Sequence, residues 1–182
     1  MIPVGYMAKR VATNPDWLRT DRVKDIYSVS SCVSADFADY INFWKHNGFW
    51  LFDSPRIIAE LAAENNVSLE GVKFFYYEVY EYQCYEDDPT WETFESEVSF
   101  PTNIEIPKQK HLEGYDVVSF YTGSTPEHSY LSCNSMAEKI DVNEHCLIST
   151  FDAAKHLLEN KAFENCEPGP CRIFAVYSLP DG

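Results

Sequence analysis

The sequence is poor in glycine, in basic side chains and in long apolar runs. It has 182 residues, with seven glycines, 14 lysines plus arginines and 29 aspartates plus glutamates, which gives a net charge of −15. Direct binding to nucleic acid or to an anionic membrane surface needs lysine and arginine against phosphate groups, so this balance argues against both. No apolar run approaches the roughly 18 residues needed to span a bilayer, and the first ten residues lack the order of a signal peptide. We therefore expect a cytoplasmic protein.

Catalytic and ligand-binding motifs are missing as well. The sequence contains no G-x-x-x-x-G-K-[ST], G-x-G-x-x-G, G-x-S-x-G or H-E-x-x-H motif. Its six cysteines form no C-x-x-C pair, and no histidine stands beside them at zinc-ligand spacing. We expect reduced thiols, as in most cytosolic proteins, although Cys166 and Cys171 flank a turn that would bring them close. We expect neither a metal nor another cofactor.

What the chain does contain is a packed core and an internal similarity. Its hydrophobic share of 45% and aromatic share of 15% are too high for a disordered chain. Four short stretches recur in the same order, with the same types of element expected at each place. The matched pairs are Gly5-Tyr6 with Gly114-Tyr115, 28–34 with 129–135, 47–61 with 143–157, and Val79-Tyr80 with Val176-Tyr177.

The repeat predicts an α+β fold of two similar small lobes. Mixed or antiparallel sheets with flanking helices fit the short strands and hairpin-like connections better than a doubly wound parallel sheet. We expect an N-terminal repeat over 1–85, an acidic, proline-containing connector over 86–111 and a C-terminal repeat over 112–182. Helices are expected after Ser34, after Ser54 and over 150–160, because a capping residue precedes apolar residues at helical spacing. Strands are expected at 25–30, 49–52, 74–82, 115–121, 129–132, 146–148 and 173–177.

The negative charge is concentrated at one place. Residues 78–97 carry eight acidic side chains and no lysine or arginine, and large rings alternate with the acids. Aromatic anchors among carboxylates suit an interface with a basic protein, since rings supply buried area and charges speed the encounter. The other interpretation is an edge strand and connector whose acidic face keeps the protein soluble. The partner-binding candidates are Tyr80, Glu81, Tyr82, Glu86, Asp87, Asp88, Trp91, Glu92 and Glu95.

An alternative site lies at two strand-to-helix turns, which the repeat matches to one another. Its candidate ligand-binding or nucleophilic residues are Ser31, Cys32, Ser132 and Cys133. Helix N-termini lower the pKa of a thiol and attract anions, so an enzyme or small-ligand site between the repeats is one possibility. The repeat copies the cysteine without a histidine to act as its base, which favours a structural role for both cysteines.

Together these features predict a non-enzymatic binding protein. We expect it to neutralise or sequester a basic protein partner, as an immunity protein or antitoxin does, and the partner to be a toxin enzyme such as a nuclease. A protein that mimics nucleic acid would be a special case of the same function. The alternative is an enzyme or small-ligand-binding protein with its site between the repeats, near Cys32 and Cys133.

Overall fold

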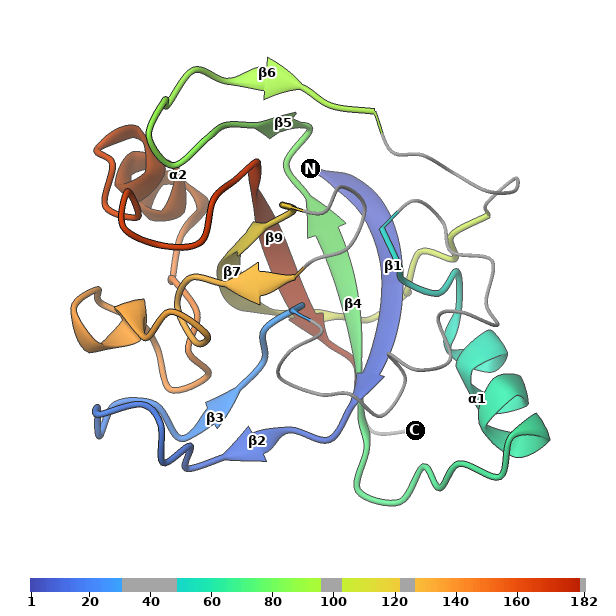
Figure 1. Cartoon of the computed structure of the whole chain (residues 1–182). Helices are drawn as coiled ribbons and strands as arrows, with labels where there is room; N and C mark the ends of the chain where they lie inside the picture. The colour runs from blue at the N-terminus through green and yellow to red at the C-terminus, as the bar shows by residue number, and fades with distance from the viewer. Residues whose placement is uncertain (31–48, 96–102, 122–126, 181–182) are drawn as a thin grey trace.

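The centre of the fold is one five-stranded sheet in the order β1-β4-β9-β7-β8 (Figure 1). The computed structural model describes residues 1–30, 49–95, 103–121 and 127–180. Every neighbouring pair of strands in this sheet is antiparallel. The strands are β1 (Ile2–Lys9), β4 (Lys73–Val79), β7 (His111–Ser119), β8 (His128–Ser129) and β9 (Cys171–Ser178).

In the described part of the chain, two small antiparallel hairpins and two α-helices surround this sheet. In Figure 1 the hairpin of β5 and β6 lies above the sheet, and the hairpin of β2 and β3 lies below it. None of the described helices has the length and apolar character needed to cross a membrane. The remaining elements are β2 (Ala12–Thr13), β3 (Asp25–Ile26), α1 (Pro55–Glu64), β5 (Tyr82–Gln83), β6 (Glu92–Thr93), the 3-10 helix η3 (Met136–Glu138) and α2 (Phe151–Glu159).

The two helices cover opposite faces of the sheet. Along β9, Phe174 and Val176 belong to the apolar cluster that contains Ile58 of α1. Ile173 directly precedes Phe174 in sequence and belongs to a second cluster, which contains Leu158 of α2. Successive side chains of a strand point to opposite faces, so the sheet is the middle layer between two cores.

The two halves of the chain share several local features. β1 and β7 each have a register shift next to a glycine with positive φ, at Gly5 and at Gly114. Each of these strands also forms an isolated antiparallel bridge just before a helix, Tyr6 with Phe52 and Tyr115 with Ile148.

Both helices then begin in the same way. Ser54 and Thr150 are extended residues whose side chains accept a hydrogen bond from the backbone N–H three residues later. This is N-capping, which satisfies a backbone N–H that has no partner within the helix.

The predicted α+β class is confirmed, since the described residues form mostly antiparallel strands and two α-helices. The helices expected after Ser54 and over 150–160 are present as α1 and α2. The stretches 49–52 and 146–148 contribute one bridge residue each instead of a strand. One sheet contains strands from both halves: β1 and β4 form one side, β9, β7 and β8 form the other, and β4 pairs with β9 where they meet. The helix expected after Ser34 lies outside the described residues.

Candidate functional site

The acidic and aromatic residues singled out in the sequence lie on and around the β5–β6 hairpin. We call residues 80–95 the acidic hairpin. Figure 1 shows it along the edge of the molecule, next to α2. The backbone of Cys84 pairs with that of Cys171 in β9 as an isolated antiparallel β-bridge, and the Lys161 ammonium donates a hydrogen bond of 2.7 Å to the Asp87 carbonyl oxygen. The backbone of the acidic hairpin is therefore fixed to both the sheet and the segment after α2.

The predicted aromatic anchors pack on one another and on α2. The Tyr80 ring lies 5.2 Å from the Tyr82 ring, 5.4 Å from the Trp91 ring and 4.9 Å from the Phe151 ring of α2, measured between centroids. Trp91 Nε1 donates a hydrogen bond of 3.1 Å to a Glu159 carboxylate oxygen. Tyr80, Tyr82 and Trp91 are half-buried in consequence. Part of their surface stabilises the hairpin, and part stays available to solvent.

The predicted carboxylates point mostly to solvent. Five of them are exposed: Glu81, Asp87, Asp88, Glu92 and Glu95. No lysine or arginine among the described residues forms an ion pair with any of these five side chains or with Glu86. The described part of the molecule therefore holds none of these carboxylates in an ion pair, and the nearby Lys161 ammonium helps to lower the pKa of Asp88.

Some of these carboxylates also shape the local backbone. Glu86 is half-buried, and its Oε2 accepts a hydrogen bond of 2.5 Å from the Gly169 N–H. Asp88 accepts hydrogen bonds from the Thr90 hydroxyl and the Thr90 N–H, which lower the pKa of its carboxyl. Glu92 accepts a hydrogen bond of 3.1 Å from the Gln83 amide. Glu86 is thus the least available of the predicted partner-binding carboxylates.

The alternative site at the cysteines can be described only in part. Ser31 and Cys32 lie outside the described residues. Ser132 is buried, and Cys133 is disulfide-bonded. The expectation of reduced thiols holds for Cys84, Cys146, Cys166 and Cys171, which are free, but not for Cys133. Ser135 occupies the N-cap position of η3 but makes no side-chain capping hydrogen bond.

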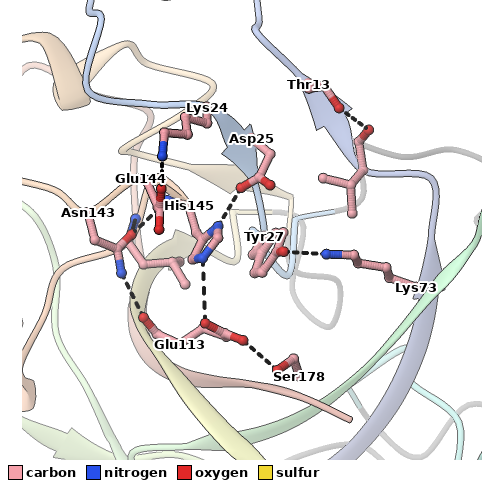
Figure 2. Close-up of polar contacts among 12 residues, drawn as sticks. Thr13, Lys24, Asp25, Tyr27, Lys73, Glu113, Asn143, Glu144, His145 and Ser178 are labelled. Carbon is pink, nitrogen blue, oxygen red and sulfur yellow. Dashed lines mark hydrogen bonds and ion pairs between the residues drawn. The ribbon is translucent and has the colours of Figure 1, made fainter. Parts of the chain in front are cut away.

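A second polar cluster was not predicted from the sequence, and it centres on His145 (Figure 2). The Nδ1 atom of His145 lies 2.5 Å from Asp25 Oδ1, and its Nε2 atom lies 3.6 Å from Glu113 Oε2. The Tyr27 ring stacks on the imidazole, with centroids 4.1 Å apart and planes 7° apart. The Ser178 hydroxyl donates to Glu113, and the Lys73 ammonium donates a hydrogen bond of 2.5 Å to the Tyr27 hydroxyl. We call these six residues the His145 cluster.

The His145 cluster borders a cavity of about 500 Å³ near the end of the sheet where β4 begins and β9 ends. Its lining residues are Tyr27, Val72, Lys73, Phe74, Glu113, Ser178, Leu179 and Pro180. These residues come from four separate parts of the chain, so no spacing in the sequence indicates that they meet. Among the described residues, those of the His145 cluster included, no group of three or more His, Cys, Asp and Glu side chains is arranged to hold a metal ion.

Comparisons with family models, with curated proteins and with solved structures give no match to this chain.

Proposed function

We propose that this protein is a non-enzymatic binding protein whose acidic hairpin docks on a basic protein partner. The observation that carries the proposal is that five carboxylates of the hairpin are exposed and form no ion pair with any described lysine or arginine. They are Glu81, Asp87, Asp88, Glu92 and Glu95. A basic surface would supply the missing positive charges. Such complementarity steers association and rejects partners of the wrong charge.

The packing of the hairpin supports the same function. Tyr80 and Trp91 attach it to α2, and the Lys161 contact holds the turn at Asp87. A surface that is already ordered loses little conformational freedom when it binds, which preserves affinity. The exposed parts of Tyr82 and Trp91, together with the exposed Tyr85, would supply apolar contact area among the charges.

The class of partner follows from the charge pattern. An acidic surface of this kind suits a cationic groove, such as the one with which a nuclease or nucleotide-transferring toxin holds its substrate. In this proposal the protein acts in the cytoplasm as an immunity protein or antitoxin does, by covering that groove.

The experiment compares the protein with two charge-reversed variants of equal net charge. Asp87→Lys/Asp88→Lys reverses the acidic hairpin. Asp16→Lys/Asp21→Lys reverses two exposed carboxylates in the connection between β2 and β3, at the opposite end of the molecule (Figure 1). Each protein is immobilised and used to capture proteins from the cells that produce it, and the association rate of the purified partner is then measured against salt.

The wild type and Asp16→Lys/Asp21→Lys should bind the same basic protein, faster at low salt. Asp87→Lys/Asp88→Lys should associate at least about tenfold more slowly and show less salt dependence. Equal association rates for the two variants would remove the acidic hairpin from the interface. A captured partner that is itself acidic would contradict the proposal as a whole.

We infer in addition that the two halves of the chain descend from one duplicated unit. The bulges at Gly5 and Gly114, the bridges of Tyr6 and Tyr115 and the caps at Ser54 and Thr150 support this origin. Gly5 pairs with Tyr77 and Gly114 pairs with Val176, so the sheet register makes Tyr77 the equivalent of Val176. The internal similarity in the sequence instead matches Val79 with Val176.

Sequences of relatives would test this origin. A common origin predicts glycine at both bulges and a capping residue at both helix starts, even where the other residues of the two halves differ. Loss of glycine at one bulge in relatives that keep the same strands would count against it.

A further inference from the structure

The cavity beside the His145 cluster has the size and the walls of a small-molecule site. A volume of about 500 Å³ lies within the range of about 300–1,000 Å³ that such sites occupy. Val72, Phe74, Leu179 and Pro180 give it an apolar wall, and the polar groups come from Tyr27, Lys73, Glu113 and Ser178. Apolar and polar groups line the cavity together, and in ligand sites a few converging polar groups fix the orientation of the bound molecule.

The polar groups offer more donors than their contacts use. The Lys73 ammonium donates a hydrogen bond of 2.5 Å to the Tyr27 hydroxyl, an interaction that raises the pKa of the Lys73 amine. An ammonium group has three N–H donors, and a tyrosine hydroxyl that accepts a hydrogen bond keeps its own proton to donate. No described carboxylate forms an ion pair with Lys73. These two residues can therefore receive an anionic group.

The Tyr27 hydroxyl is held in position from behind. Its ring is buried, stacks on His145 at 4.1 Å and contacts the Phe75 ring at 4.8 Å. His145 is fixed in turn, because Asp25 and Glu113 lie at its two ring nitrogens (Figure 2). A ligand would thus meet an arranged pair of donors and would not have to order them.

Glu113 restricts the charge that the cavity accepts. One of its carboxylate oxygens accepts from Ser178, and the other faces His145 Nε2 at 3.6 Å. The carboxylate is therefore already partnered, yet it keeps negative charge on the cavity wall. A multiply charged anion such as phosphate would be repelled more strongly than a single carboxylate.

From these contacts we infer that the cavity binds a small organic monocarboxylate. Its carboxylate accepts hydrogen bonds from Lys73 and Tyr27, and its apolar body lies against Val72, Phe74, Leu179 and Pro180. This site is separate from the acidic hairpin, and it does not depend on the function proposed above.

The test is an NMR titration of the full chain with phenylacetate, phenylacetamide and inorganic phosphate. Phenylacetate should cause saturable shifts of the backbone amides of Lys73, Glu113 and Ser178. Phenylacetamide has the same shape without the charge, and phosphate has charge without the apolar body, so both should bind at least about tenfold more weakly. We expect a Kd of about 1 mM or tighter for phenylacetate. Absence of saturable shifts up to about 10 mM phenylacetate would overturn the inference.

Three variants locate the binding. Lys73→Met and Tyr27→Phe should each weaken phenylacetate binding about tenfold, because each removes a donor to the carboxylate. Lys139→Met is the matched control, since Lys139 lines a different hollow, of about 400 Å³, between η3 and α2. Both variants should fold, because Lys73 is exposed and Tyr27→Phe keeps the aromatic ring. Equal weakening by Lys139→Met, or equal affinity for phenylacetamide, would contradict the assignment.

Discussion

The hydroxyl group of Ser28 donates a hydrogen bond of 2.5 Å to Oδ2 of Asp116. Ser129 donates one of 2.6 Å to Oδ1 of the same carboxylate, and the Val29 N–H donates a third of 3.2 Å. Asp116 is fully buried, and burial raises the pKa of its carboxyl while these hydrogen bonds oppose the rise. One carboxylate in β7 thus joins the strand to the segments around Ser28 and Ser129.

Replacing Asp116 should destabilise the protein strongly. Asp116→Ala leaves three buried donors without their acceptor, so the free energy of unfolding should fall by about 3 kcal/mol. The measurement is denaturation by urea. Asp141→Ala is the control, because the Asp141 side chain is 97% exposed and its change should stay within about 0.5 kcal/mol. Equal effects of the two substitutions would contradict the role of Asp116.

Lys9 should make the stability depend on pH. Burial lowers the pKa of its amine from 10.5 to about 7. Between these values the unfolded chain binds a proton that the folded chain has released, so the free energy of unfolding rises with pH across that window.

Buried thiols oppose this trend at higher pH. Burial raises the pKa of Cys84 from 9.0 to about 12, so above about pH 9 the unfolded chain loses a proton that the folded chain keeps, and stability falls. Urea denaturation from pH 6 to pH 9 should show a rise in the wild type and a flatter profile in Lys9→Met. A rise of the same slope in both proteins would assign it to another group.

Trp91 should control the attachment of the acidic hairpin to α2. Trp91→Ala removes the contact with Tyr80, the hydrogen bond to Glu159 and the stacking beneath the Lys155 ammonium. We expect a loss of about 2 kcal/mol in the free energy of unfolding, with faster hydrogen exchange of the β5 amides than of the β9 amides. Tyr85→Ala, at a ring that is 42% exposed, should leave both measurements close to the wild type.

Gly114 should tolerate no side chain. Its φ is +149°, and a Cβ atom there would lie 2.8 Å from Leu147 Cβ and 2.9 Å from the Ile148 carbonyl oxygen. Gly114→Ala should therefore reduce the free energy of unfolding by about 3 kcal/mol. Gly71→Ala is the comparison, since φ is also positive there but the nearest atom lies 3.9 Å away. In Gly71→Ala the free energy of unfolding, measured by thermal denaturation, should fall by only about 1 kcal/mol. Equal losses in the two variants would show that backbone strain alone, without the close contacts of the Cβ atom, acts at Gly114.

The α+β class and the positions of both described helices could be predicted from the sequence. The signals are local: an N-cap at Ser54 or Thr150 and apolar residues at helical spacing lie within a few residues of each other. The concentration of acids between Glu78 and Glu97 was also visible, because charge can be counted along the chain.

The tertiary structure alone decided which residues meet. Asp25 and His145 are 120 residues apart, and they come together because backbone N–H groups within residues 24–27 donate to the carbonyl oxygens of Glu144 and His145. The cavity that Lys73 and Glu113 border also forms only in the folded chain, because β4 and β7 both pair with β9. Register and strand order depend on the packing of the whole core, and no short stretch of sequence contains that information.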